Sequence, residues 1–290
     1  MNLSVVILTY NEEANVGRCL TSLEPLRAPI FVVDSGSTDG TAVIARKAGC
    51  TVVTHPFATH AQQWAWALEH LPLQTDWVLA LDADQALTPE LAAELRDLDP
   101  EPALEGFYLR RRQVFRGRWI RHGAYYPKYL LKLFRRQCVY FDAHDLLDHH
   151  FYVSGPTRRL RHDLVEANVK ENDICFWTEK HTRYAALVAR EELCRLAAPT
   201  PDPLRATLAG NPDQRTLWLK QRWRKLPLYV RPFLYFVYRY FFRLGFMDGK
   251  EGFIFHFLHS FWFRLLVDIK REELSRGTES LSPSSGQPRG

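Results

Sequence analysis

The sequence predicts an α/β protein with a mostly parallel sheet covered by helices on both faces, followed by an amphipathic helical extension. In residues 1–98, short runs of β-branched and aliphatic residues alternate with segments whose apolar residues recur at helical spacing. The short runs are unbroken apolar stretches, which is typical of strands buried on both faces of a parallel sheet. From residue 218 onward, aromatic and basic residues dominate, which indicates a second helical part.

Four strands are expected in the first part of the chain, and each is followed by a helix. The strands are predicted in residues 4–10, 30–33, 50–57 and 76–84. The first helix shows the pattern clearly, because Val16, Leu20 and Leu23 recur at intervals that place them on one helical face. The last of these helices is predicted to start at Thr88 and Pro89, a favourable cap and first residue.

The alternation stops after this helix. Residues 106–120 and 129–147 are expected to form antiparallel strands, and residues 176–197 a helix. We therefore divide the chain into four parts by composition and periodicity. These are a first domain over residues 1–197, a Pro-rich linker or loop over 198–217, an aromatic and basic helical segment over 218–274, and a disordered tail over 275–290.

Composition narrows the class of protein. The five cysteines lack CxxC spacing, so neither a disulfide framework nor a zinc knuckle is indicated, and a reducing, cytosolic compartment fits best. The first residues lack the basic start of a signal peptide, so export is not expected. No stretch reaches the roughly 18 uncharged apolar residues of a spanning helix, so any membrane contact is expected to be peripheral.

Asp82 and Asp84 follow the fourth predicted strand. If the strand continues to its last residue, alternation points both carboxylates to the same face, and they repel each other unless a cation joins them. Mg²⁺ or Mn²⁺ takes one or two protein carboxylates and completes its shell with phosphates and water. A helix-capping Asp beside a surface Asp is the simpler alternative, and the position after a buried strand favours the metal site.

Two further polar clusters follow the first and second strands. Thr9, Tyr10 and Asn11 are expected to form a wall for a nucleobase, although Asn11 and the acids after it also suit a helix start. Asp34 and Ser35 lie where a base or ribose can be hydrogen-bonded, and the glycine after them permits close backbone approach. Tight-turn chemistry alone would also explain residues 36–39. All three clusters should meet at one edge of a parallel sheet.

These three clusters, in their order and spacing, resemble family 2 glycosyltransferases of the GT-A fold. The resemblance covers residues 3 to 190 and is carried by VVILTYNEE, VVDSGSTDGT and DWVLALDAD. It implies that residues 1–197 form a GT-A catalytic domain in which the first two motifs bind a nucleotide-sugar donor and the third holds a metal on its diphosphate. The implied donor-binding residues are Thr9, Tyr10, Asn11, Glu12, Asp34, Ser35, Gly36, Gln63, Asp82, Ala83 and Asp84, with Asp82 and Asp84 as ligands of Mg²⁺ or Mn²⁺. Only the resemblance favours a UDP-sugar.

The segment YPKYLLKLFRR with AHDLLDHH after it looks like bacterial lipopolysaccharide and exopolysaccharide transferases that read roughly RLFRR and then VHE. In that alignment His144 and Asp145 take the His-Glu places, so Asp145 is the expected general base. The sequence departs from the pattern because Asp is shorter than Glu and Lys132 replaces an Arg. The cluster continues through Asp148, His149 and His150, and its histidines could instead lie at the surface or at an interface. Zinc binding by this cluster is disfavoured because no cysteine thiolate belongs to it.

The C-terminal segment suggests contact with a membrane. Arg231, Arg239 and Arg243, with Tyr235 between them, are expected on one helical face, and Phe and Tyr residues lie elsewhere on the surface. Aromatic residues and Arg at headgroup depth would hold the protein on the inner leaflet of a bacterial plasma membrane. GFMDGKEGFIFHF also resembles the extension of transferases with lipid-linked acceptors. The alternative is a helical pair that packs on the first domain or across a dimer.

The sequence therefore predicts an inverting, metal-dependent glycosyltransferase with a bacterial glycan or lipid-linked acceptor. A nucleotidyltransferase on a related sheet is the rival enzyme, but it would need a Gly-rich loop and a basic residue near the first strand. The other rival is a non-catalytic peripheral protein that binds membranes or anions, which has no need of Asp82 and Asp84. Nucleic-acid binding is not expected, because the aromatic residues do not interleave with the basic runs as a stacking platform would.

Overall fold

A nine-stranded mixed sheet forms the centre of the protein, as the computed structural model shows for residues 1–142, 145–146, 150–197 and 204–280. The strands lie in the order β3-β2-β1-β4-β8-β6-β9-β5, and β7 pairs with β6. Their bounds are β1 (Leu3–Thr9), β2 (Ile30–Asp34), β3 (Thr51–Thr54), β4 (Trp77–Asp82), β5 (Gln85–Leu87), β6 (Gly106–Phe115), β7 (Arg118–Ile120), β8 (Lys128–Arg135) and β9 (Thr157–Glu166). The four strands β3, β2, β1 and β4 are parallel, which confirms the predicted fold class.

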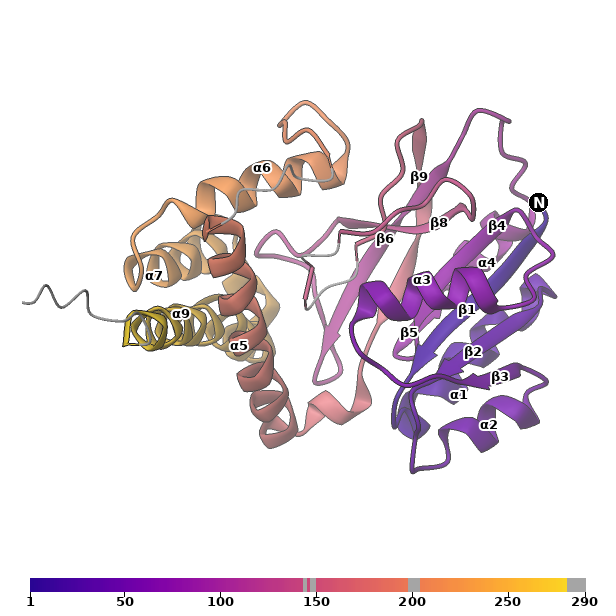
Figure 1. Ribbon diagram of the computed structural model, residues 1–290, viewed down its shortest axis with the longest axis horizontal. Coiled ribbons are helices and arrows are strands. Elements are labelled where there is room, and N and C mark those ends of the chain that lie inside the picture. Colours follow the sequence, from indigo (N-terminus) through magenta and orange to yellow (C-terminus); the bar gives the residue numbers. More distant parts are fainter. Residues whose placement is uncertain (143–144, 147–149, 198–203, 281–290) are drawn as a thin grey trace, which may run out of the picture.

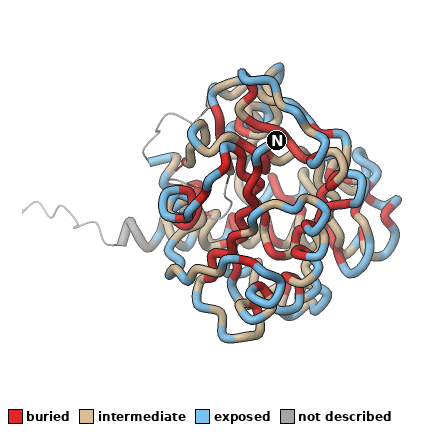
Figure 2. The backbone as a smooth tube through the Cα atoms, turned by 90° about the vertical axis from the view of Figure 1, so that its right-hand side faces the viewer, coloured by how far each residue is buried: buried red, intermediate tan, exposed pale blue. Residues whose placement is uncertain are grey.

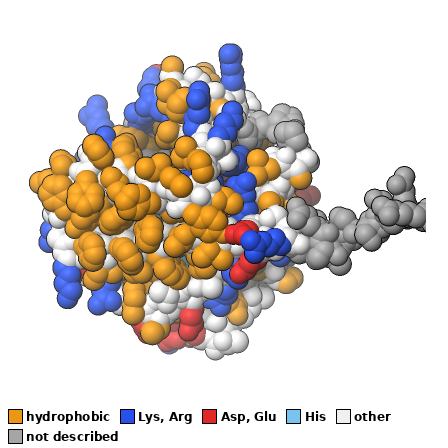
Figure 3. All heavy atoms as spheres, turned by 90° about the vertical axis from the view of Figure 1, so that its left-hand side faces the viewer, with side chains coloured by type: hydrophobic (Ala, Val, Ile, Leu, Met, Phe, Trp, Pro, Cys, Tyr) orange, Lys and Arg blue, Asp and Glu red, His pale blue; other side chains and the backbone are white. Residues whose placement is uncertain are grey.

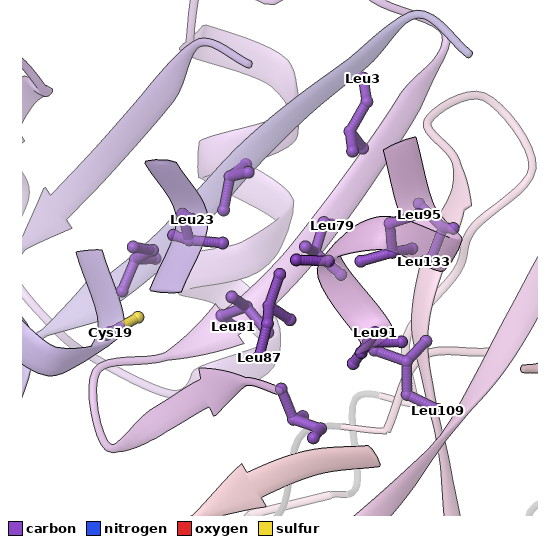
Figure 4. Close-up of a cluster of buried hydrophobic side chains, with 14 of the residues drawn as sticks. Leu3, Cys19, Leu23, Leu79, Leu81, Leu87, Leu91, Leu95, Leu109 and Leu133 are labelled. Atoms are coloured by element: carbon purple, nitrogen blue, oxygen red, sulfur yellow. The ribbon is translucent and has the colours of Figure 1, made fainter. Parts of the chain in front are cut away.

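Helices cover both faces of the parallel strands (Figure 1). They are α1 (Glu13–Leu23), α2 (Thr41–Lys47), α3 (His60–His70) and α4 (Pro89–Arg96). On one face, Leu3 of β1 shares a core with Leu23 of α1 and Leu91 of α4 (Figure 4), and Val5 and Ile7 of β1 belong to the same core. On the opposite face, Val6 packs with α3 in a second core. This alternation along β1 explains why its sequence is apolar at every position.

The buried residues run along the strands in the middle of the molecule (Figure 2). The prediction of antiparallel strands after α4 is right for β6, β7 and β8, but β8 ends at Arg135 and not near residue 147. The sequence analysis missed β9. Its run of Arg, His and Asp hides the pattern, since Leu160 and Leu164 are buried while Arg158 and Arg161 are exposed.

A layer of helices stands beside the sheet, on the left of Figure 1. It contains α5 (Ile174–Ala197), α6 (Pro212–Arg224), α7 (Val230–Val237), α8 (Gly249–His256) and α9 (Phe263–Ser280). Helix α6 begins inside the segment expected as a linker, and α9 runs past the residue at which the tail was expected to begin. Residues 198–203 of the linker and 281–290 of the tail lie outside the described part of the chain.

Two apolar clusters join this layer to the rest of the protein. Phe115 and Ile120 of the sheet pack with Trp177 of α5 and Phe255 of α8. Ala185 and its neighbours on α5 pack against α9. Within the described residues, one helical stretch, Gly245–Arg276, is long and apolar enough to cross a membrane by length and composition, and 39% of its most apolar window is buried inside the protein.

Candidate active site

The carboxyl ends of β1, β2 and β4 lie side by side. In the ladder between β1 and β2, Thr9 is the partner of Asp34, and in the ladder between β1 and β4, Leu8 is the partner of Asp82. The three predicted polar clusters therefore meet at one edge of the sheet, where ligands bind in open α/β sheets.

Asp34 organises the turn after β2. Its Oδ1 accepts hydrogen bonds from Thr9 Oγ1 at 2.9 Å and from Ser37 Oγ at 2.6 Å, and its Oδ2 accepts from the backbone N–H groups of Gly36 and Ser37 at 3.1 and 2.8 Å. The carboxylate is almost fully buried. Gly36 has a φ of +85°, which a glycine adopts without strain. Turn formation thus accounts for the contacts of Asp34 and Gly36, and their contact with a donor stays a prediction.

The loop after β1 is fixed against the same turn. Asn11 donates its backbone N–H to Ser37 Oγ at 2.8 Å, and its Oδ1 accepts from the N–H of Thr38 at 2.8 Å. Its left-handed φ of +52° suits Asn better than most residues. Tyr10 beside it is 58% exposed, so its ring is accessible to a planar ligand. The role of these residues as a wall for a nucleobase stays a prediction.

Gln63 of α3 lies beneath Ser35. Its side chain is buried, donates from Nε2 to Ser35 Oγ at 3.2 Å and lies 2.7 Å through Oε1 from His55 Nδ1. His55 in turn stacks on Trp66 at 4.0 Å between ring centroids. Gln63 is thus placed to orient Ser35, and contact of either residue with a donor stays a prediction.

Asp82 ends β4, and Asp84 lies in the turn after it, so strand alternation does not fix the direction of Asp84 as the sequence analysis assumed. Ala83 between them is buried in the core, and its contact with a donor stays a prediction. Lys132 Nζ donates to Asp82 Oδ2 at 2.9 Å from β8. Asn168 Nδ2 donates to Asp84 Oδ2 at 3.3 Å from the segment after β9.

Asp84 lies among other acids. Burial, followed by the charges of Glu166 and Asp82, raises the pKa of Asp84 to about 8. A carboxyl group in such surroundings is stabilised as an anion by a nearby cation. This physical setting is what the two aspartates would offer to a divalent ion.

Basic side chains surround this acidic cluster. Lys170 Nζ donates to Glu12 Oε1 at 2.6 Å and to the carbonyl oxygen of Asn11 at 2.8 Å. Lys180 of α5 donates to Glu171 at 2.7 Å, and although burial opposes its charge, Glu171 and then Asp84 among its neighbours raise the pKa of Lys180 above its ordinary value. These lysines place positive charge beside the strand ends, where a diphosphate would bind.

The residues present fit a Mg²⁺ or Mn²⁺ ion. Within the described part of the chain, no group of three or more His, Cys, Asp or Glu is arranged to hold a metal ion. Asp82 and Asp84 would therefore provide the protein's carboxylates, and phosphate oxygens and water would complete the shell. Because Lys132 holds Asp82 Oδ2, a cation there would share this carboxylate with the lysine.

Asp145 lies apart from the strand-end turns, in the segment between β8 and β9. Its carboxylate is 5% exposed, and Oδ1 accepts a hydrogen bond from Arg195 of α5 at 2.9 Å. Arg195 also donates to Asp142 at 2.8 Å, and His150 Nδ1 lies 3.3 Å from Asp145 Oδ2. His144, Asp148 and His149 of the predicted cluster lie outside the described residues.

The family model described as Glycosyl transferase family 2 matches residues 4–159, which is more than half of the chain and contains all the strand-end turns described above. The chain belongs to glycosyltransferase family 2. The predicted resemblance is thereby confirmed at the level of the family. The match ends within β9, before the helical layer begins.

Several relatives of this family 2 chain carry related names. A Rickettsia conorii protein named uncharacterized glycosyltransferase is 41% identical over 93 residues, which are 32% of this chain and 32% of that protein. A Rhizobium meliloti protein named lipopolysaccharide core biosynthesis glycosyltransferase LpsC is 40% identical over 104 residues, which are 34% of this chain and 36% of that protein. The chain thus spans about a third of the length of these curated relatives.

Solved structures are similar to parts or to most of the family 2 chain. Glucosyl-3-phosphoglycerate synthase from Mycobacterium tuberculosis, in complex with Mn²⁺ and UDP-glucose, is 25% identical, and the match covers 40% of this chain and 44% of that one with a TM-score of 0.30. TarS 1–349 from S. aureus is 16% identical, and the match covers 96% and 92% of the two chains with a TM-score of 0.46.

The structure of this family 2 chain adds residues that the sequence analysis did not assign. Lys132 was noted only as a departure from a pattern, and its contact with Asp82 joins residues 50 positions apart. Asp213, placed in the linker by composition, accepts a hydrogen bond from Tyr108 of β6 at 2.6 Å, and burial raises the pKa of its carboxyl group. The sequence shows only an Asp in a Pro-rich stretch there, and nothing in it indicates that this Asp is buried against β6.

Proposed function

We propose that the chain is an inverting glycosyltransferase that moves a sugar from a nucleotide-sugar donor to a bacterial glycan or lipid-linked acceptor in cell-envelope polysaccharide synthesis. The observation that supports this most is the meeting of the Thr9, Asp34 and Asp82 turns at one edge of the sheet, with Asp84 in an acidic setting beside them. A UDP-sugar is the favoured donor. The name of the relative LpsC supports an acceptor in lipopolysaccharide.

The donor is proposed to lie across the strand ends. Its base would stack on the exposed ring of Tyr10, and the turns around Asn11 and Ser35 would offer backbone groups to the base and ribose. Its diphosphate would lie near Asp82 and Asp84, where Lys132 and Lys180 add positive charge. A bound Mg²⁺ or Mn²⁺ would stabilise the negative charge that grows on the leaving diphosphate.

Transfer is proposed to occur by direct displacement. The acceptor hydroxyl oxygen forms a bond to the anomeric carbon while the bond from that carbon to the diphosphate oxygen breaks, and the configuration inverts. The hydroxyl proton goes to a carboxylate, for which Asp145 is the proposed base. Arg195 holds Oδ1 of Asp145 at 2.9 Å, whereas Oδ2 has the longer contacts, at 3.3 Å from His150 Nδ1 and 3.4 Å from the hydroxyl of Tyr152, so the proton would go to Oδ2.

The acceptor is proposed to arrive at the inner face of the bacterial plasma membrane, with the protein peripheral and cytoplasmic. The helical layer supports this location, because α7 and α8 carry exposed aromatic side chains. The site turns lie on the sheet, and α5 extends from them into the helical layer. The helical layer would therefore contact the membrane while the sheet of the same protein meets the sugar-accepting end of a lipid-linked acceptor.

A panel of nucleotide sugars, each with and without Mn²⁺, tests the proposal. A donor that binds the folded protein raises its melting temperature by mass action, and hydrolysis of that donor reports on bond cleavage. We expect one UDP-sugar to stabilise the protein with Mn²⁺ and Asp84→Asn to lose this effect and the hydrolysis. Asp97→Asn, an exposed control on the surface after α4, should behave like the wild type. Hydrolysis that is independent of metal and unchanged in Asp84→Asn would exclude the proposed function.

A further inference from the structure

We propose that residues 226–257 form a docking surface that lies in the plane of an anionic lipid bilayer. We call it the aromatic face. The side of the molecule that carries α7 and α9 shows a broad area of hydrophobic side chains, with Lys and Arg and some Asp and Glu at its margins (Figure 3). Soluble monomers rarely expose apolar patches of this kind without a partner. The inference rests on and deepens the membrane location proposed above, and it can be tested separately from the proposed sugar transfer.

The aromatic face gathers most of the exposed apolar side chains. In the described part of the chain, 13 of the 21 exposed large hydrophobic residues fall between residues 226 and 257. The most prominent of them are Phe233, Leu234, Phe241, Phe242, Phe246 and Phe253, and Phe242 is 76% exposed. Single exposed apolar residues scattered over a surface are normal in soluble proteins. These residues come from one short segment, so they form one apolar surface.

The same segment turns charged groups inward. Arg231 is 0% exposed and binds Asp268 and Glu192. Arg239 donates to the carbonyl oxygen of Gly123 at 2.7 Å and lies over the ring of Tyr125. The arginines expected at headgroup depth therefore hold the layer together instead, which corrects the predicted placement of Arg231 and Arg239. A helix that faced water would show the opposite arrangement, with its charges outward and its aromatics inward.

The charges that do remain at the surface favour an anionic partner. Between residues 222 and 257, every exposed charged side chain is basic: Arg222, Lys225, Arg243 and Lys250. The two acids of this stretch do not offset them, since Asp248 is buried against His122 and Glu251 is half-buried. Phenylalanine and tyrosine beside lysine and arginine, without exposed acids, match the interface of an anionic bilayer, where each basic residue adds attraction.

The helical stretch that begins within the aromatic face and continues beyond it makes contacts that favour docking in the plane of the bilayer over crossing it. The stretch Gly245–Arg276 passes the length and composition test for a spanning helix. Its second half, however, packs on α5 and holds the fully buried Asp268 against Arg231. A helix held in this way shows only one side to lipid, so it can lie on the surface without exposing a charge to hydrocarbon.

Flotation with preformed vesicles tests the inference. The wild type should float with vesicles of phosphatidylcholine and phosphatidylglycerol, should bind pure phosphatidylcholine much more weakly, and should be released by alkaline carbonate. The double variant Phe241→Ser, Phe242→Ser should lower the partition coefficient by about tenfold or more, because two exposed rings no longer enter the interface. Arg243→Gln with Lys250→Gln should lower only the preference for phosphatidylglycerol.

Two controls separate docking from folding and from activity. Phe57→Ser removes a ring that is 50% exposed but lies between β3 and α3, and it should float like the wild type. Asp84→Asn should also float like the wild type, whether or not it transfers sugar. Wild-type protein that stays unbound with phosphatidylglycerol vesicles, or a double variant that floats normally, would overturn the inference. So would retention after carbonate, which indicates an inserted helix, or a dimer in solution that the double variant abolishes.

Discussion

At the scale of single residues, Lys132 and Arg195 each reach a carboxylate far from them in the sequence. Lys132 binds Asp82, the proposed metal ligand, and Arg195 binds Asp145, the proposed base. Both basic residues are almost fully buried at the side chain. A buried cation beside a carboxylate fixes its position more firmly than a surface pair does.

Lys132 should matter through its charge. Lys132→Met removes positive charge beside Asp82 and the proposed diphosphate, so we expect kcat/KM for sugar transfer to fall by about tenfold to a hundredfold. Lys132→Arg keeps the charge and should retain most of the activity. Steady-state transfer kinetics at several Mn²⁺ concentrations measure this. Wild-type kinetics in the Met variant would show that the contact has no part in donor binding.

Asp145 should act on the chemical step and not on donor binding. Asp145→Asn cannot accept the acceptor's proton, so we expect kcat to fall by at least about a hundredfold. Stabilisation by the donor with Mn²⁺ should stay unchanged, because Asp145 lies outside the strand-end turns. Asp142→Asn, which alters the neighbouring partner of Arg195, is the matched control. A fall in donor binding equal to the fall in kcat would argue for a structural role of Asp145.

Arg231 should be important for stability. It is fully buried between Glu192 and Asp268, so Arg231→Met leaves the buried Asp268 without its arginine and leaves Glu192 with Arg271 alone. We expect the free energy of unfolding to fall by about 3–5 kcal/mol, as measured by urea denaturation. Arg276→Met removes an exposed pair with Glu272 and should have little effect. Equal stability of the two variants would contradict this account of the helical layer.

At the scale of elements, the helical layer buries three histidines that are neutral in the folded state. Burial lowers the pKa of His181 on α5 and of His256 on α8 to about 4, and it lowers the pKa of His259 well below its ordinary value. His256 faces Arg239, Asp248 and His122, and both of its ring nitrogens are buried without a hydrogen-bond partner among the residues that the structure describes. Protonation is therefore unfavourable in this layer.

Acid should weaken the helical layer. At His181 and His256, the unfolded chain binds protons below about pH 6.5, whereas the folded chain does so only near about pH 4. The free energy of unfolding should therefore fall as the pH decreases between these values. His256→Gln should flatten part of this slope in urea denaturation series, and His70→Gln, an exposed histidine, should not. Identical slopes in the wild type and His256→Gln would contradict the assignment.

Local patterns predicted the parallel strands and their helices, because each is encoded by adjacent residues such as those around Val16 and Thr88. The orientation of the C-terminal helices was not predictable in this way. Four-residue spacing predicts that Arg231 and Arg239 share one helical face, but spacing does not say whether that face meets solvent or Asp268. Only the packing of α7 against α9 decides this, and that contact joins segments far apart in the sequence.

At the scale of the whole molecule, α5 connects the two functional regions. Arg195 of α5 binds the Asp145 segment, and Glu192, three residues earlier, binds Arg231 and Arg271 of the helical layer. The turns of the site were predictable because they follow strands that the sequence shows plainly. Contacts such as Lys132 with Asp82 or Tyr108 with Asp213 were not, because they depend on strand order and on the position of α6.

The most direct test of the central claim is phosphorus NMR of UDP with Mn²⁺ and the protein. Paramagnetic broadening of both phosphorus signals measures whether the ion is held against the diphosphate at Asp82 and Asp84. We expect broadening with the wild type well beyond that of free Mn²⁺ and UDP, and its loss in Asp84→Asn. Equal broadening with the wild type and Asp84→Asn would contradict the account, because the paired aspartates would then have no part in holding the ion on the donor.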